Sequence, residues 1–142
     1  MPSDAVLKTM NYIHRGVLAI TRGRVGWVVA RMPAVKLTTT GRNSGRKRQV
    51  ILTTPYQNRQ FILIVASRGG DDRHPDWYLN LLVNPNATIV DLEGVERAVT
   101  ASLPDRNQYS ELWGLVIEKH PRYLAYQKKT ERQIPLVLLT ET

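Results

Sequence analysis

The sequence predicts an α+β fold in which a small antiparallel barrel, or a barrel-like sheet, is surrounded by helices. Short apolar segments of strand length recur along the chain, the first with period-two alternation, and tight turns join most of them. No alternation of strand and helix of the βαβ kind occurs, which argues against a doubly wound parallel sheet. With 142 residues the chain has the length of one domain with a sizeable core. We expect one domain over residues 1–142, with its barrel core over residues 35–139.

The first 30 residues predict an amphipathic helix and a lead-in to the sheet. Apolar residues from Asp4 to Thr21 recur at the spacing of one helix face, and Lys8, Arg15 and Arg22 flank that face. Two interpretations stay open. The helix covers one end of the sheet, or it is a basic amphipathic helix that rests on an anionic membrane surface.

The next segments predict strands joined by turns. Residues Val35–Thr40 alternate apolar and polar side chains, Gly41–Gly45 is a run of turn formers, and Val50–Leu52 opens a second strand. A turn over Tyr56–Arg59 leads to Phe61–Ala66, whose apolar composition predicts a strand buried on both faces.

The second half of the chain mixes helices and strands. Ser67–His74 is a polar loop with paired glycines, and Pro75 stands at a first helical position. That helix carries Trp77 and Tyr78, which we interpret as core residues. The remaining predicted elements are strands over Asn86–Leu92 and Val95–Leu103, a helix from Pro104-Asp105 that His120-Pro121 interrupts, a shorter helix with Tyr123 and Tyr126, and a strand over Ile134–Leu139.

Positive charge is concentrated at one end of the chain. The formal net charge is +8, and it divides into +9 for residues 1–48 and −1 for the rest. A field of this sign attracts nucleic acid, anionic lipid or an acidic cofactor.

The turn after the first predicted strand carries much of this charge. Arg42, Arg46, Lys47 and Arg48 have no acidic residue among them, and Ser44 adds a hydroxyl. Guanidinium groups, backbone N–H groups and a hydroxyl together are donors for phosphate or clustered carboxylates. From the residues alone, an anion site and a solvated hairpin are equally good interpretations.

Several classes of chemistry lack their motifs. The chain has no cysteine, no glycine-rich dinucleotide motif and no P-loop. His14, His74 and His120 lie far apart in the sequence, so we predict no metal site. Few aromatic residues accompany the basic strands, so we expect no specific nucleic-acid readout. Without an apparent signal peptide or membrane span, a cytoplasmic protein is expected.

Three blocks, in order, resemble the deazaflavin-dependent nitroreductase family. They are TTTGRNSGRKR, ASRGGDDRHPDWYLNLLVNP and HPRYLAYQKKTERQIPLVLL. Members of this family are split β-barrel oxidoreductases that use the reduced 8-hydroxy-5-deazaflavin coenzyme F-420. The resemblance therefore implies an antiparallel split β-barrel with peripheral helices.

The resemblance assigns the basic turn to the anionic tail of the coenzyme. The matching residues are Arg42, Asn43, Ser44, Gly45, Arg46, Lys47 and Arg48, with Arg68 of the following glycine loop on the same side. Asn43 departs from the family pattern, in which many members have lysine. The expected surface for the ring system is formed by Ile51–Thr54 and by Leu63–Ala66, with Ala66 as a cofactor-binding residue.

The resemblance also implies the residues at the substrate. Ser67 and the tyrosines of the late helix, Tyr123 and Tyr126, match pocket residues of the family, and His120 lies three residues before Tyr123. A spacing of three lets both tyrosine hydroxyls project from one helix face. From periodicity alone, tyrosines that merely pack are the better interpretation; the resemblance favours Tyr123 and Tyr126 as catalytic residues.

The resemblance implies a reductase for small electron-poor molecules. Expected substrates are enones and α,β-unsaturated lactones of the coumarin or aflatoxin type, quinones and nitroaromatics. Two alternatives stay open: the same barrel with FMN, and a non-enzymatic basic module for anionic membrane or nucleic acid. A monomer and a homodimer are both compatible with the sequence.

Overall fold

In the computed structural model, the structure describes residues 28–29 and 32–142, and the predicted N-terminal helix lies outside them. The strands are β1 (Val28–Val29), β2 (Met32–Thr40), β3 (Lys47–Thr53), β4 (Tyr56–Gln57), β5 (Ile62–Val65), β6 (Asn86–Val90), β7 (Glu96–Ser102) and β8 (Leu136–Glu141). The helices are the 3-10 turn η1 (Arg68–Gly70), α2 (Asp76–Val83), α3 (Arg106–Lys119) and α4 (Arg122–Gln127).

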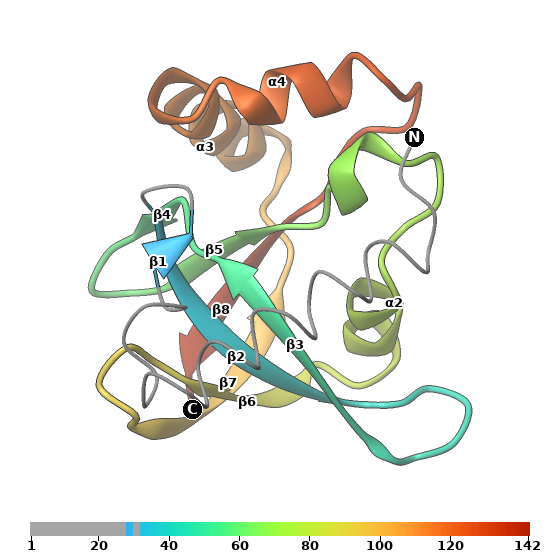
Figure 1. Ribbon diagram of the computed structural model, residues 1–142, viewed down its shortest axis with the longest axis vertical. Coiled ribbons are helices and arrows are strands. Elements are labelled where there is room, and N and C mark those ends of the chain that lie inside the picture. The colour runs from blue at the N-terminus through green and yellow to red at the C-terminus, as the bar shows by residue number, and fades with distance from the viewer. Residues whose placement is uncertain (1–27, 30–31) are drawn as a thin grey trace.

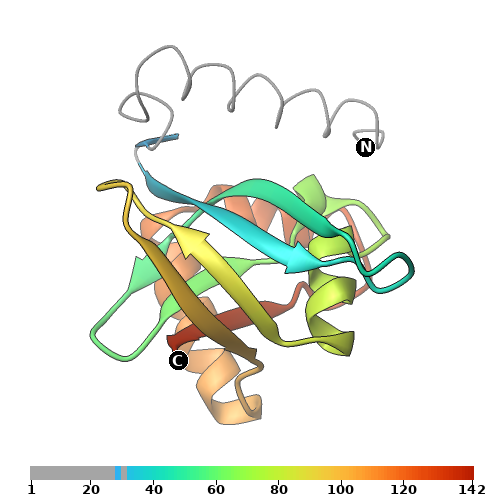
Figure 2. The same cartoon turned by 90° about the horizontal axis from the view of Figure 1, so that it is seen from below.

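The strands form one antiparallel sheet in the order β1-β2-β6-β7-β8-β5-β4, and β3 pairs with β2. The sheet is strongly curled, as Figure 2 shows, and α2 lies where the β2–β3 hairpin ends. Figure 1 shows α3 and α4 together across the top of the sheet. The predicted α+β fold with an antiparallel, barrel-like sheet is confirmed.

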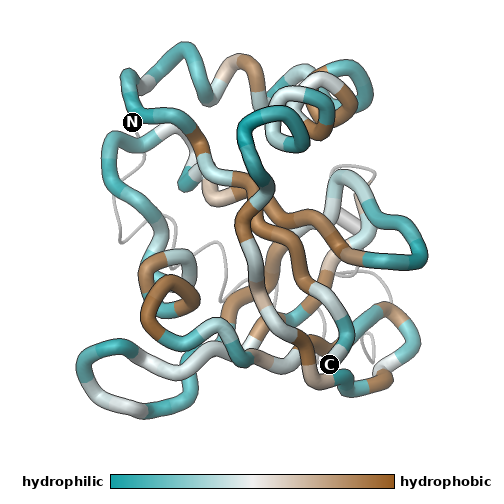
Figure 3. The backbone as a smooth tube through the Cα atoms, turned by 180° about the vertical axis from the view of Figure 1, so that it is seen from behind, coloured by the Kyte–Doolittle hydropathy of each residue, from teal (hydrophilic) through white to brown (hydrophobic). Residues whose placement is uncertain are grey.

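Two hydrophobic clusters lie on opposite faces of the central strands. Ile64 of β5 packs with Trp77 and Tyr78 of α2, whereas its neighbours Leu63 and Val65 pack with α3 and α4. This alternation makes β5 the strand buried on both faces that the sequence predicted. Figure 3 shows the most hydrophobic residues in these central strands and in α2, while the β2–β3 turn is hydrophilic. The prediction that Trp77 and Tyr78 belong to the core is also confirmed.

Several predicted boundaries differ from the structure: β2 begins at Met32 rather than at Val35, and β3 begins at Lys47 rather than at Val50. The segment predicted as a turn over Tyr56–Arg59 begins instead with β4, and the turn itself comes later, where the Asn58 side chain accepts hydrogen bonds from the N–H groups of Gln60 and Phe61. The last strand begins at Leu136 rather than at Ile134. Pro135 has no N–H group to donate to a ladder, so regular pairing starts after it.

None of the helices among the described residues is long and apolar enough to span a lipid bilayer. Within the same residues, no three histidine or carboxylate side chains gather in a way that would hold a metal ion.

Candidate active site

The β2–β3 turn is held by its own backbone. The Gly41 N–H donates to the Arg46 carbonyl at 2.8 Å, and the Gly45 N–H donates to the Gly41 carbonyl at the same distance. Gly45 has φ +71°, a conformation that favours glycine. Gly41 is needed for space instead: an added Cβ would lie 2.9 Å from Ser44 Oγ and 3.2 Å from the Arg46 carbonyl oxygen. Of the two glycines of this turn, only Gly45 adopts a positive φ.

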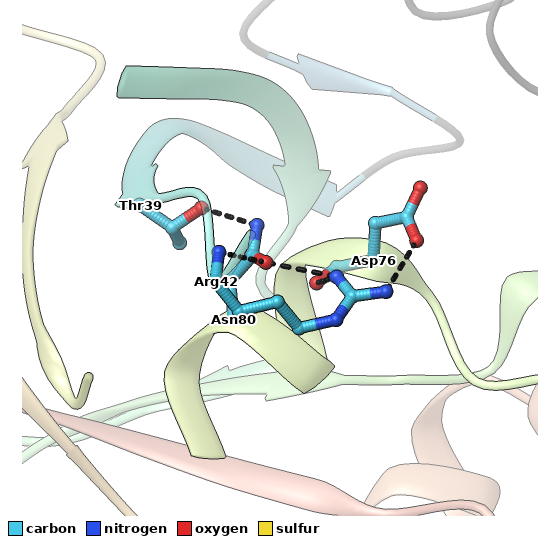
Figure 4. Close-up of polar contacts among 4 residues, drawn as sticks. All are labelled: Thr39, Arg42, Asp76 and Asn80. Atoms are coloured by element: carbon cyan, nitrogen blue, oxygen red, sulfur yellow. Dashed lines mark hydrogen bonds and ion pairs between the residues drawn. The ribbon is translucent and has the colours of Figure 1, made fainter. Parts of the chain in front are cut away.

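The first arginine of the turn binds helix α2 (Figure 4). Asn80 Oδ1 accepts from the Arg42 backbone N–H at 3.1 Å and from Arg42 Nη1 at 2.9 Å. Asn80 Nδ2 donates to Thr39 Oγ1 at 3.2 Å, and Asp76 Oδ1 lies 3.4 Å from Arg42 Nη2. Asn80 is only 3% exposed. The Arg42 side chain thus anchors the turn to the protein, a use that the local sequence pattern did not indicate.

The remaining cations of the turn face solvent. Arg46, Lys47 and Arg48 are exposed, and no ion pair joins them to an acidic residue within the part of the chain that the structure describes. Lys47 and Arg48 begin β3, opposite Thr40 and Thr39. Guanidinium and ammonium groups are strong donors to anions, so the anion-binding role of this turn stays a prediction that its exposed cations fit. Asn43 and Ser44 are exposed beside them, and Ser44 Oγ accepts from the Arg46 N–H at 3.1 Å.

A second arginine-bearing segment connects β5 to α2. Its residues Arg68, Gly69 and Gly70 have φ values of +47°, +65° and +88°, so three consecutive residues are left-handed. This conformation costs about 1–2 kcal/mol for a residue with a Cβ such as Arg68. The surrounding contacts must therefore hold this backbone in place.

Two opposite charges of this segment are buried together. The Arg68 guanidinium forms a buried ion pair with Asp71, and the Asp71 carboxylate also accepts from the Arg73 N–H at 3.0 Å. That backbone hydrogen bond, together with the Arg68 and Arg73 charges, lowers the pKa of Asp71 against the opposing effect of burial. The Arg68 guanidinium thus lies on Asp71 in this structure, and its contact with the coenzyme tail stays a prediction.

Arg132 is a central residue of the site that the sequence patterns did not single out. Its Nε donates to the Asp71 carbonyl at 2.9 Å, its Nη1 to the Ala66 carbonyl at 3.2 Å and its Nη2 to the Ser67 carbonyl at 2.9 Å. It lies at least 61 residues from each of these partners in the sequence, so no local pattern could indicate the contacts.

The Arg132 guanidinium also determines which ring nitrogen of neutral His74 carries the proton. Arg132 Nη1 lies 3.2 Å from His74 Nδ1, and a guanidinium can only donate, so Nδ1 is the acceptor and the proton is on Nε2. Burial and the Arg132 charge lower the pKa of His74. His74 is therefore neutral near pH 7.

The two tyrosines of α4 have different surroundings. Tyr123 is 4% exposed, and its hydroxyl lies 2.9 Å from Thr53 Oγ1 and 3.8 Å from Met32 Sδ. Burial raises the pKa of Tyr123, and the Thr53 hydrogen bond opposes that shift. Tyr126 is half-buried, packs edge-on against the Tyr123 ring at 5.9 Å, and its hydroxyl has no hydrogen-bond partner in the described part of the chain. Of the two, Tyr126 has the hydroxyl that is available to a ligand.

His120 and Ser67 complete the predicted set. His120 is half-buried with its ring 6.4 Å from that of Tyr123, and burial is the main cause that lowers the pKa of His120. Ser67 is only 8% exposed, yet its hydroxyl makes no hydrogen bond within the described residues. A buried hydroxyl without a partner is uncommon and marks a place for a ligand group or water.

The structure separates the two segments expected to contact the ring system. Residues 63–66 are buried, and β5 pairs with strands on both sides, so its backbone groups are used. By contrast, β3 pairs only with β2, so its other edge has no strand partner among the described strands. The end of β3 is therefore the better candidate surface for a planar ring.

An apolar hollow lies elsewhere on the molecule. It has a volume of about 200 Å³ and is lined by residues that include Leu81, Leu82 and Leu103. None of the residues predicted from the sequence to form the site lines it.

The basic turn, α2 and η1 occupy one side of the molecule, on the right in Figures 1 and 2, and α4 crosses above η1. An added Cβ on Gly70 would lie 2.7 Å from the Tyr126 carbonyl oxygen. Residues 66–71, which we call the Ser67 segment, are therefore in direct contact with α4. The segment that carries Ser67 and the helix that carries Tyr126 are thus in contact, and α2 contacts the β2–β3 turn through Asn80 and Arg42.

Comparisons with known proteins identify the family. The model of the F420H(2)-dependent quinone reductase family matches residues 12–141. An F420H(2)-dependent quinone reductase of Mycobacterium tuberculosis is 39% identical over 140 residues, which cover 95% of this chain and 89% of that protein.

Solved structures of similar sequence agree with this family assignment. An F420-H2 dependent reductase is 38% identical with a TM-score of 0.65, over 75% of this chain and 93% of that one. A second structure, described as a domain-swapped dimer, is 34% identical with a TM-score of 0.69, over 92% of this chain and 98% of that one. The fold, the oxidoreductase class and the coenzyme predicted from the sequence are those of this family, which overturns the alternative of a non-enzymatic basic module. The chain belongs to the F420H(2)-dependent quinone reductase family.

Proposed function

We propose that this protein reduces quinones with reduced coenzyme F-420 as the hydride donor. The observation that carries the proposal is the set of outward cations on the β2–β3 turn, in a chain of this family. Quinones come first among the expected substrates because the related proteins are named as quinone reductases. Enones, unsaturated lactones and nitroaromatics share the electron-poor character of a quinone and form the wider test set.

The donor groups of the turn fit the coenzyme. The tail of this coenzyme is a phosphodiester with several carboxylates, and such groups bind guanidinium and ammonium groups strongly. Arg46, Lys47 and Arg48 would hold the tail, with Asn43 and Ser44 beside them. Arg42 would support the site without contacting the tail, because its guanidinium fixes the turn to Asn80 and Asp76 of α2.

When bound, the coenzyme supplies a hydride in a two-electron step. Hydride addition to a quinone leaves negative charge on a ring oxygen, which needs hydrogen-bond donors and a proton. The unpartnered Ser67 hydroxyl is a donor for that oxygen, and the Tyr126 phenol and the His120 ring are candidates for holding the proton. The Tyr123 hydroxyl is hydrogen-bonded to Thr53, and the Tyr123 ring packs edge-on against the Tyr126 ring and so supports it.

A binding experiment followed by a turnover experiment tests the proposal. Purified protein is titrated with the oxidised coenzyme, and reduced coenzyme is then mixed with menadione while the absorbance of the oxidised form is followed. We expect micromolar affinity and quinone-dependent oxidation of the coenzyme. Absence of coenzyme binding would refute the proposal, and binding without oxidation by any quinone, enone or nitroaromatic would remove the reductase assignment.

We also infer that the protein forms a homodimer. The support is the similar structure that is described as a domain-swapped dimer and covers 92% of this chain. Light scattering coupled to size-exclusion chromatography distinguishes a dimer of the 16.2 kDa chain from a monomer. A single mass near that of one chain at all concentrations would contradict the inference.

A further inference from the structure

One side chain binds the backbone of the Ser67 segment at three points. The Arg132 guanidinium donates to the carbonyls of Ala66, Ser67 and Asp71, so it spans the segment from its first residue to the end of η1. Its fourth contact, with His74, lies just before α2. Few side chains other than a planar fork with five N–H groups could reach these acceptors together.

The segment needs such a support. Three successive left-handed residues, 68–70, follow Ser67, and within this stretch only two backbone hydrogen bonds close the turn: Gly70 N–H to the Ser67 carbonyl at 2.9 Å, and Asp71 N–H to the Arg68 carbonyl at 3.2 Å. The carbonyl of Ser67 thus accepts from both Gly70 and Arg132. The Arg132 guanidinium thus adds three hydrogen bonds to the two that the segment makes within itself.

Arg132 is itself held by helix α4. Gln127 Nε2 donates to the Arg132 carbonyl at 2.7 Å, and Gln127 Oε1 accepts from the Ile134 N–H at 2.9 Å. Gln127 directly follows Tyr126 on the helix. A continuous chain of hydrogen bonds therefore joins α4, which carries Tyr126, to the segment that carries Ser67.

We propose that Arg132 is a positioning residue that fixes the backbone of residues 66–71 against α4 and so sets the distance between Ser67 and Tyr126. The consequence for catalysis rests on the proposed reductase function. The positioning itself does not, because it concerns contacts within this chain. Arg132 touches no candidate ligand-binding side chain of the turn, so its effect on the coenzyme tail is indirect.

The first experiment measures positioning without any ligand. Arg132→Lys keeps the charge but loses the fork, and Arg59→Gln removes an exposed arginine from the β4–β5 turn as a control. We expect amide hydrogen exchange at Gly70 and Asp71 to accelerate roughly tenfold or more in Arg132→Lys, while amides of the β5–β8 ladder keep their protection. Arg59→Gln should match the wild type throughout.

Two results would overturn the positioning role. Unchanged exchange at Gly70 and Asp71 would show that the charge alone suffices. A parallel loss of protection in the β5–β8 ladder would show that Arg132 stabilises the whole fold and not this segment. Arg132→Gln serves as a second variant, and if it does not fold, Arg132→Lys still decides the question.

The second experiment measures the consequence for the reaction. We expect kcat with menadione to fall roughly tenfold or more in Arg132→Lys, and by a larger factor than the coenzyme Kd rises, because the tail cations lie on the other turn. Unchanged kcat together with a loosened segment would contradict the catalytic consequence. Wild-type protein without coenzyme binding would refute the proposed function, while the exchange result would still decide the positioning role.

Discussion

The β2–β3 turn and the segment between β5 and α2 both carry arginines, but they present them in opposite directions. In the turn, Arg46, Lys47 and Arg48 face solvent without acidic partners in the described residues. In the segment, Arg68 is buried on Asp71. Each region is anchored by one distant side chain, Asn80 for the turn and Arg132 for the segment.

This difference separates two uses of positive charge. Exposed cations contribute little to folding, so a set of them held on a rigid backbone is available for a ligand. Buried cations with acidic partners hold the backbone in its conformation, and removing one partner leaves an uncompensated charge. The same type of substitution should therefore change ligand binding in one region and stability in the other.

The largest expected effect is on coenzyme binding by the turn. In the triple variant Arg46→Gln, Lys47→Gln, Arg48→Gln, we expect the coenzyme Kd to rise about 100-fold or more, because each charge-assisted hydrogen bond contributes roughly 1.5–3 kcal/mol. The free energy of unfolding should change by less than about 1 kcal/mol, since all three side chains are exposed. Fluorescence titration and urea unfolding measure the two quantities.

A matched triple variant controls for net charge. Arg59→Gln, Arg106→Gln, Lys128→Gln removes three exposed cations elsewhere on the chain. We expect at most a small, salt-dependent loss of affinity from it, because long-range attraction is screened at physiological ionic strength. Equal losses in both triple variants would mean that the turn acts through its general field and is not a binding site.

The next effect is on stability. Asp71→Asn removes the carboxylate that pairs with Arg68, whose side chain is also buried. Breaking this buried ion pair should lower the free energy of unfolding by roughly 3 kcal/mol. Urea unfolding near neutral pH measures the loss. A variant as stable as the wild type would show that the buried charges of this segment do not hold the fold.

The role of the Asp71 carboxylate in stability can also be tested through the pH dependence of the free energy of unfolding. The folded-state pKa of Asp71 is lowered, so its carboxylate stabilises the fold above the ordinary carboxyl value of 3.8 and loses this effect as the pH falls toward the lowered pKa. We therefore expect wild-type stability to decline between about pH 5 and pH 3 more steeply than that of Asp71→Asn. Parallel pH profiles would assign the acid sensitivity to other carboxylates.

A smaller effect is expected at the anchor of the turn. Asn80→Ala removes the acceptor of two Arg42 hydrogen bonds and the donor to buried Thr39, which should lower the free energy of unfolding by about 2 kcal/mol. Because the turn loses its support on α2, the coenzyme Kd should also rise. Asn80→Asp retains the acceptor oxygens and should keep most of the affinity. Equal affinity in Asn80→Ala and the wild type would separate the anchor from the site.

Local patterns predicted much of this fold. Period-two alternation located β2, apolar composition located β5, and Pro75 and Asp105 indicated the starts of α2 and α3. At the start of α3, the Asp105 side chain accepts from the Gln108 N–H. The cations of the turn were also found from sequence, because a tight turn must expose most of its side chains.

The direction of other side chains depends on contacts that are distant in the sequence. Arg68 pairs with Asp71 in a left-handed segment whose backbone Arg132 contacts from 61 positions away or more. Asn80 meets Arg42 across 38 positions. Such pairs are set by how the strands and helices pack, so a motif can name the residue but not its orientation.

The smallest expected effects separate the two tyrosines of α4, which the sequence predicted to project together. Tyr123→Phe leaves the half-buried Thr53 hydroxyl without its partner and should lower the free energy of unfolding by about 1 kcal/mol, with little change in turnover per folded molecule. Tyr126→Phe should leave stability unchanged, because its hydroxyl makes no hydrogen bond within the described residues, but it should lower kcat with menadione more than it changes the coenzyme Kd. Steady-state kinetics and urea unfolding of both variants measure the difference. The reverse result, with turnover lost only in Tyr123→Phe, would require the Thr53 pair to open during the reaction and would return Tyr123 to the substrate side.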